Sequence, residues 1–299
     1  MTAVAVTPRS FRQTPGEHVD RLRSEVDVRF PDLDRPLDEE EMVELITGCA
    51  GLIVGVDPVT KRVLEAGPLR AVVKYGSGMD NIDVPAAEAL RVRVSSTPGA
   101  NARSVAELAI ALLLALARNV ATHDRSVRER SWRRITGVEL AGKRLGIIGY
   151  GAIGREVARI ARGLEMDVVA HDPLLESADV PLVALAELYA TSDAVSLHVP
   201  LTAATRGMVG AEELAAMKPT AFLLNTARGG LVDEQALAEA LASGRPAGAA
   251  LDGFDEEPLG DSPLRGLDNV VLSPHAGAAT FDAVRRTATR AVDQLLRDL

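Results

Sequence analysis

The sequence predicts an α/β protein built from two doubly wound parallel sheets. Short β-branched and apolar runs alternate with helical patterns along most of the 299 residues, as in consecutive βαβ units. One turn-rich segment, Thr97-Pro98-Gly99-Ala100-Asn101, separates an earlier series of such patterns from a later one. A chain of this length is also typical of about two domains.

The first series precedes the turn-rich segment and predicts one parallel sheet. Its strand candidates are Val4–Val6, Val26–Phe30, Gly51–Val54 and Ala71–Lys74. Helical patterns lie between the later strands, at Glu39–Thr47 and Thr60–Glu65.

A long apolar helix is expected at Ser104–Asn119, directly after the turn-rich segment. Apolar residues occupy nearly all of its faces, so we expect it to be buried between domains or between subunits. Its most apolar run, Leu108–Ala117, is too short to span a bilayer. A charged segment, Arg125–Arg134, follows and contains Trp132, the only tryptophan.

The second series has the number and rhythm of elements of a doubly wound nucleotide-binding domain. Its strand candidates are Arg144–Ile148, Asp167–His171, Ala194–Val199, Ala221–Leu224, Gly248–Leu251 and Asn269–Leu272. Helices fit between them, for example at Ile153–Leu164, Leu182–Ala190 and Glu234–Ser243. The last stretch, Thr280–Leu299, has the pattern of one amphipathic helix.

Composition restricts the partners and the compartment. The formal net charge of -9 predicts repulsion from nucleic acid and from anionic membranes. Cys49 is the only cysteine, which excludes an internal disulfide and fits a reducing compartment. The segment Met1–Pro8 lacks the pattern of a secretory signal. We therefore expect a cytoplasmic protein without a nucleic-acid, membrane or metal partner.

A glycine-rich turn is the strongest local motif. In Leu145–Gly154, Gly149 would allow a tight turn, Gly151 the close approach of a pyrophosphate, and Gly154 close helix–strand packing. The next strand pattern ends at Asp172, whose carboxylate could bind ribose hydroxyls and repel a 2′-phosphate. This context predicts NAD rather than NADP, whereas the alternative is an ordinary glycine turn followed by a capping aspartate.

Three further residues are candidates for catalysis. Arg228 follows a predicted strand and could hold an anionic group, and His275 could exchange a proton near neutral pH. Glu257 could orient that histidine and stabilise its charged form. From the residues alone, a surface arginine, a structural histidine and a solvated acidic turn remain open interpretations.

The motifs together resemble those of the D-isomer-specific 2-hydroxy acid dehydrogenase family, and within it the phosphoglycerate dehydrogenase-like branch. The resemblance covers nearly the whole chain. It is carried by Tyr75–Asp83, Asn101–Glu107, Trp132, Glu139–Lys143, Leu197–Thr202, Asn225–Gly230, Asp252–Pro258 and Ser273–Gly277.

The resemblance implies a domain arrangement and a reaction. Residues 1–98 and 279–299 would form a flavodoxin-like substrate domain, and residues 99–278 a Rossmann NAD-binding domain. The enzyme would transfer a hydride between NAD(H) and C2 of a small anionic D-2-hydroxy or 2-oxo acid. The active site would lie between the domains, and a homodimer would form through the NAD-binding domain.

The resemblance also implies residue roles. Arg228 would anchor the substrate, His275 would be the acid/base, and Glu257, which directly precedes Pro258, its carboxylate partner. Backbone N–H groups of Ser77 and Gly78 would bind the substrate carboxylate. The implied cofactor-binding residues are Gly149, Gly151, Ala152, Ile153, Gly154, Asp172, His198, Pro200, Thr205, Thr226, Ala227, Asp252, His275 and Gly277.

The substrate is less well defined. Arg9 and Lys74 could bind a second anion, which favours a doubly charged acid such as 3-phosphoglycerate, although both could be surface charges. The stretch Val54–Pro58 lacks the cation that known phosphoglycerate dehydrogenases carry there. A phosphonopyruvate or phosphonolactate dehydrogenase, a glyoxylate/hydroxypyruvate reductase and an NAD(H)-sensing binding protein therefore remain alternatives.

Overall fold

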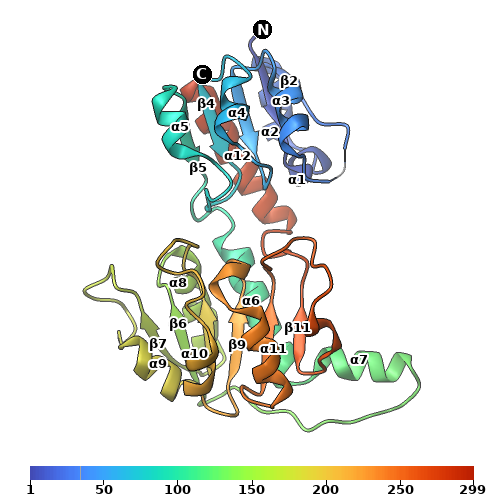
Figure 1. The fold of residues 1–299 in the computed structure, drawn as a ribbon, viewed down its shortest axis with the longest axis vertical. Helices are drawn as coiled ribbons and strands as arrows, with labels where there is room; N and C mark the ends of the chain where they lie inside the picture. Colours follow the sequence, from blue (N-terminus) through green and yellow to red (C-terminus); the bar gives the residue numbers. More distant parts are fainter. Residues whose placement is uncertain (34) are drawn as a thin grey trace. The chain divides into compact units, whose positions relative to one another are not determined.

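The computed structural model describes residues 1–33 and 35–299, which divide into two compact units. Unit 1 comprises Met1–Asn101 and Ala278–Leu299, and unit 2 comprises Ala102–Gly277. Each unit contains one parallel sheet with helices packed against it (Figure 1). The predicted α/β class with two doubly wound sheets is confirmed.

Unit 1 is built on a five-stranded parallel sheet with the strand order β2-β1-β3-β4-β5. The strands are β1 (Ala3–Val6), β2 (Asp27–Arg29), β3 (Gly51–Val54), β4 (Ala71–Lys74) and β5 (Arg93–Ser96). Every residue of β3 and β4 is buried, as expected for parallel strands covered on both faces. This order is that of flavodoxin-like sheets.

The helices of unit 1 are α1 (Arg9–Gln13), α2 (Glu17–Glu25), α3 (Glu39–Ile46), α4 (Lys61–Glu65), α5 (Val84–Ala89) and α12 (Phe281–Asp298). Side chains that accept backbone N–H groups set where several of them begin, as Thr60 does for α4 and Thr280 for α12. The C-terminal helix α12 packs Ala288, Val292 and Leu295 into the same core cluster as Val4 and Val6 of β1. The C-terminal helix and the N-terminal strand therefore belong to one core.

Unit 2 is built on a six-stranded parallel sheet with the order β11-β10-β9-β8-β6-β7. The strands are β6 (Arg144–Ile148), β7 (Asp167–His171), β8 (Ala194–Leu197), β9 (Phe222–Asn225), β10 (Gly248–Leu251) and β11 (Val270–Leu272). A single parallel bridge between Ala170 and Leu182 extends the sheet beyond β7. Counted with this bridge, the order is that of dinucleotide-binding sheets, whose ligands bind where the strand order reverses.

Helices pack on both faces of the unit 2 sheet. The helices of the unit are α6 (Ala102–Ala117), α7 (Val120–Arg128), α8 (Ala152–Gly163), α9 (Leu185–Thr191), α10 (Ala211–Ala216) and α11 (Glu234–Ala242), with 3-10 turns at Gly229–Leu231 and Pro263–Gly266. Residues of α6 and α8 share one core cluster, whereas residues of α9, α10 and α11 share another. The reversal point between β6 and β8 therefore lies in a sheet with a packed core on each face.

The expectation that the helix after the turn-rich segment is buried between domains or between subunits stays a prediction. One face of α6 packs against α8 and the sheet of its own unit, while Leu114 is 38% exposed. Among the described helices, none is by itself long and apolar enough to cross a membrane, and α6 and α7 meet that criterion only as a pair bent by 64°.

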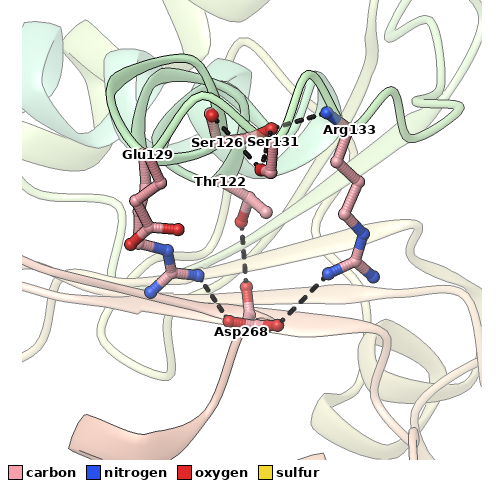
Figure 2. Close-up of a pocket in the computed structure, with 7 residues that line it drawn as sticks. Thr122, Ser126, Glu129, Ser131, Arg133 and Asp268 are labelled. Atoms are coloured by element: carbon pink, nitrogen blue, oxygen red, sulfur yellow. Dashed lines mark hydrogen bonds and ion pairs between the residues drawn. The ribbon is translucent and has the colours of Figure 1, made fainter.

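The charged segment after α6 begins as a helix, α7, which the sequence pattern did not predict. Figure 1 shows α7 standing out from the sheet of its unit, followed by a long loop. Asp268, which precedes β11, pairs with Arg125 and, at 3.7 Å, with Arg133, and Ser126 bonds to Ser131 at 2.9 Å (Figure 2). These contacts fix the start of the loop, while Trp132 remains 73% exposed.

Candidate active site

The glycine turn lies between β6 and α8, at the reversal point of the unit 2 sheet. Gly149 has a φ of 91°, and a Cβ there would lie 2.6 Å from the carbonyl oxygen of His198. A Cβ at Gly154 would lie 2.2 Å from the carbonyl oxygen of Gly149. A Cβ at Gly151 would meet no described protein atom within 4 Å. Protein packing therefore requires two of the three glycines, and the third leaves open space at the N-terminus of α8, as a pyrophosphate needs.

Asp172 directly follows β7 and lies beside the glycine turn. Its Oδ2 accepts the N–H of Tyr150 at 2.8 Å, and its Oδ1 accepts that of Leu174 at 3.0 Å. These bonds fix a half-buried carboxylate next to the turn, where a ribose hydroxyl could bind it.

His198 and Thr226 follow β8 and β9, two neighbouring strands, and each has a buried polar atom without a partner in the described part of the chain. For His198 this atom is Nδ1, because Nε2 lies 2.9 Å from Ser196 Oγ, and for Thr226 it is Oγ1. Burial lowers the pKa of His198 to about 4, so its ring is neutral at neutral pH. Buried polar atoms are normally hydrogen-bonded, and a bound dinucleotide would supply the missing partners. The residues of this site therefore fit NAD.

The other predicted cofactor residues lie at the same sheet edge or next to it. Ala152 and Ile153 form the first turn of α8, and Ala227 donates its N–H to Asn225 Oδ1 at 3.1 Å. Thr205 donates its hydroxyl to the carbonyl oxygen of Pro200 at 2.6 Å, which closes a turn after β8.

His275 and Glu257 form a hydrogen-bonded pair. Nδ1 of His275 lies 2.7 Å from Glu257 Oε2, and Glu257 Oε1 accepts the N–H of Phe254 at 3.1 Å. Partial burial raises the pKa of Glu257, but the bond and charge of His275, the Phe254 N–H and the charge of Arg228 outweigh it, and the pKa is lowered overall. Glu257 is therefore ionised. With Nδ1 occupied and its side chain 40% exposed, His275 can offer Nε2 to a ligand.

Asp252 holds the backbone around His275. Residue 275 has a φ of 53°, a left-handed conformation that costs about 1–3 kcal/mol outside glycine unless its surroundings enforce it. The next two N–H groups, of Ala276 and Gly277, donate to the buried Asp252 carboxylate at 2.7 and 2.8 Å. The carbonyl of Gly277 in turn accepts the hydroxyl of Ser104 at 2.7 Å. A contact of Asp252 with the nicotinamide carboxamide stays a prediction.

Arg228 lies in the loop after β9, next to the loop that carries Glu257. A Cβ at Gly229 would lie 1.9 Å from the carbonyl carbon of Phe254, so the two loops approach as closely as only glycine permits. Asn225 fixes the Arg228 loop by donating to the carbonyl of Arg228 at 2.7 Å. Unit 2 thus brings the three predicted catalytic residues together at the carboxyl edge of its sheet.

The predicted substrate loop of unit 1 follows β4. The N–H groups of Ser77 and Gly78 have no partner among residues 1–33 and 35–299, and Ser77 is exposed. Arg9 is exposed at the start of α1, whereas Lys74 is only 5% exposed and is not the surface charge that we considered as an alternative. Its ammonium donates to the carbonyl of Gly55 and, at 2.6 Å, to Asn81 Oδ1.

Sequence reasoning missed Asn81 and Thr97, which brace this loop. One signal was available: a lysine at the end of a wholly apolar strand needs buried acceptors nearby, and Asn81 is one of the few acceptor side chains in the segment that follows.

Comparisons with known proteins identify the family of the chain. Residues 110–277 match the family model of the D-isomer specific 2-hydroxyacid dehydrogenase, NAD binding domain. A hydroxypyruvate reductase of Thermotoga maritima is 43% identical over 272 residues, which cover 88% of this chain and 89% of the relative. The chain belongs to the D-isomer specific 2-hydroxyacid dehydrogenase family.

Two further relatives extend the comparison. A D-3-phosphoglycerate dehydrogenase of Methanocaldococcus jannaschii is 41% identical over 292 residues, which cover 94% of this chain but only 56% of the relative. The crystal structure of the TT0316 protein from Thermus thermophilus superimposes with a TM-score of 0.92 at 38% identity, covering 99% of this chain and 96% of that one. This 2-hydroxyacid dehydrogenase is therefore an NAD-dependent oxidoreductase.

Proposed function

We propose that this 2-hydroxyacid dehydrogenase acts on a compact 2-oxo or 2-hydroxy acid with a single anionic group, of the hydroxypyruvate or glyoxylate type. The observation that carries the proposal is the burial of Lys74, whose ammonium already donates to the carbonyl of Gly55 and to Asn81 Oδ1. The neighbouring stretch Gly55–Pro58 offers no cation. This departs from our first expectation of a doubly charged acid. The similarity to a hydroxypyruvate reductase, over nearly the whole length of that relative, supports a singly charged substrate.

The catalytic roles follow from the contacts in unit 2. In the direction of reduction, His275 donates a proton from Nε2 to the oxygen on C2, and it takes that proton back in oxidation. Glu257 holds Nδ1 and stabilises the charged imidazole. Arg228 binds the substrate anion and polarises the C2 carbonyl. When bound, the nicotinamide ring supplies or accepts the hydride.

The remaining assignments concern the substrate carboxylate and the cofactor ribose. The carboxylate is bound by the N–H groups of Ser77 and Gly78, which lack partners within the described chain. Asp172 accepts the ribose hydroxyls and disfavours a 2′-phosphate, so NADH is used in preference to NADPH.

A second candidate is a doubly charged acid such as 3-phosphohydroxypyruvate. Arg9 favours it, because this exposed cation begins α1 just beyond the carboxyl end of β1. The similarity to a D-3-phosphoglycerate dehydrogenase points the same way.

A panel of 2-oxo acids separates the two candidates. Initial rates of NADH oxidation are measured with glyoxylate, hydroxypyruvate, 3-phosphohydroxypyruvate and 3-phosphonopyruvate, and each assay is repeated with NADPH. We expect kcat/KM to be at least about tenfold higher for the best singly charged acid than for either doubly charged one, a difference of about 1.4 kcal/mol. A preference for a phosphorylated or phosphonate acid would overturn the proposal in favour of the second candidate.

A further inference from the structure

A buried polar cluster lies beneath the substrate loop of unit 1. Its centre is the ammonium of Lys74. This residue is the last of β4 and immediately precedes the loop. Burying a charge is costly unless hydrogen bonds replace its water. Here the carbonyl of Gly55 and Asn81 Oδ1 replace that water, which makes the ammonium an internal cross-link.

Asn81 connects the far end of the loop to the same point. Its Nδ2 donates to the carbonyl of Gly55 at 3.1 Å and to that of Asp57 at 2.5 Å. Lys74 and Asn81 therefore flank the loop 75–80 and tie both of its ends to the segment that follows β3. Both ends of the loop are therefore bonded to one short segment, Gly55–Asp57, which we call the anchor segment.

The anchor segment is itself braced. The buried Asp57 carboxylate accepts the N–H of Leu37 at 2.8 Å and the hydroxyl of Thr7, and Thr7 Oγ1 accepts the N–H of Gly55 at 3.1 Å. Three adjacent strands, β1, β3 and β4, thus meet in one hydrogen-bonded group at their carboxyl ends.

A second brace acts at the start of the loop. The buried Thr97, just after β5, accepts the N–H of Gly76 at 2.8 Å and donates its own N–H to the carbonyl of Gly76 at 2.9 Å. The next two N–H groups, of Ser77 and Gly78, are the ones without partners in the described chain. The loop is therefore fixed on both sides of these two N–H groups.

We propose that Lys74 is a positioning residue of the dehydrogenase, and that it acts through Asn81 to hold the Ser77 and Gly78 N–H groups in the geometry that binds the substrate carboxylate. The inference rests on the proposed function only in assigning the carboxylate to these two N–H groups. An ammonium suits the task because its three donors can point at acceptors in different directions. Lys74 thus contributes to substrate affinity without touching substrate.

The test compares Lys74→Met, Asn81→Ala and the double variant with the wild-type enzyme. Lys74→Met keeps most of the side-chain length and removes the donors. We expect each single variant to raise KM about tenfold, because a displaced loop weakens carboxylate binding, while kcat changes less than about threefold. The Kd for NADH, measured by fluorescence titration, stays unchanged. The double variant matches the single ones, because both residues act through one cross-link.

Two controls accompany the comparison. Lys61→Met removes an exposed lysine of α4 in the same unit and leaves KM unchanged. Lys74→Arg, which keeps a cation and its donors, recovers part of the affinity. Should Lys74→Met fail to fold, Asn81→Ala carries the test, because it removes the same cross-link while the lysine stays in place.

Three outcomes would overturn the proposal. A loss confined to doubly charged acids, with Asn81→Ala unaffected, would make Lys74 an anion ligand. A lower thermal midpoint with unchanged KM would make the cluster structural only. Additive effects in the double variant would mean that the two residues act separately. The variants are assayed with the best singly charged and the best doubly charged 2-oxo acid of the wild-type enzyme. The wild-type panel alone decides whether the proposed substrate is right, so its failure is distinct from failure of this inference.

Discussion

At the scale of single residues, the proposed function depends on side chains whose ionisation and orientation are set by their hydrogen-bond and charge partners. Glu257 is ionised because the His275 and Arg228 charges and the Phe254 N–H outweigh its burial. In the proposed mechanism this carboxylate holds the imidazole of His275, the proton donor in the direction of reduction.

Glu257→Gln should lower the turnover of the enzyme. The carboxylate holds His275 with one oxygen and the Phe254 N–H with the other, and an amide keeps only one of these acceptors. The kcat at neutral pH should therefore fall about tenfold or more. The measurement is kcat for 2-oxo acid reduction together with the Kd for NADH, and an unchanged kcat would remove Glu257 from the mechanism.

His198 makes a prediction about stability. Its pKa falls from 6.5 to about 4 on folding, so the unfolded chain binds more protons between these values. The free energy of unfolding should therefore fall as the pH drops through this window, by at most about 3 kcal/mol from this group. Urea unfolding of the cofactor-free protein should show a weaker pH dependence in His198→Gln. An equal pH dependence of the free energy of unfolding in the two proteins would contradict the inference that burial lowers the pKa of His198.

At the scale of elements, the sequence pattern located the strands that are buried on both faces. The interior strands β3 and β4 match their predicted bounds, as do β6, β7 and β10, because continuous apolar runs have few other structures available. The pattern missed β5, whose residues Arg93-Val-Ser-Ser are mostly polar and only partly buried. It also missed α7, a charged helix at the edge of its unit. Tertiary contacts stabilise these elements, and a local pattern does not contain them.

The glycine turn gives a matched pair of variants. In Gly151→Ala the new methyl group meets no described protein atom, and the backbone φ of -79° suits alanine, so stability should change by less than about 1 kcal/mol. The Kd for NADH should nevertheless rise at least about tenfold, because the methyl group occupies the space of the pyrophosphate. Gly154→Ala is the contrast, since its methyl group would lie 2.2 Å from the Gly149 carbonyl oxygen and should destabilise the fold. Unchanged NADH affinity in Gly151→Ala would place the cofactor elsewhere.

At the scale of the whole molecule, the glycine turn and the three candidate catalytic residues could be predicted because each follows a strand in a short motif. The polar cluster around Lys74 could not, since its members come from three strands that only the folded sheet brings together. The same holds for the tether from Asp252 to residues 276 and 277, which joins the ends of two neighbouring strands.

We also propose that the enzyme is a homodimer formed through unit 2. Large apolar side chains are exposed on and after α7, with Val120 and Val127 each 54% and Trp132 73% accessible. Such a group is typical of a subunit interface. Trp132→Ser should shift sedimentation velocity towards the monomer at micromolar concentrations, whereas Leu174→Ser, at an exposed site outside this segment, should not. A wild-type protein that sediments as a monomer would refute the dimer.

The most direct test of the catalytic account is the turnover of His275→Asn with the best 2-oxo acid and NADH. Asparagine tolerates the left-handed backbone at this position but cannot act as the acid. We predict that kcat falls about 100-fold or more while the Kd for NADH is retained. Turnover close to that of the wild-type enzyme, with the same cofactor affinity, would contradict the assignment of His275 as the proton donor.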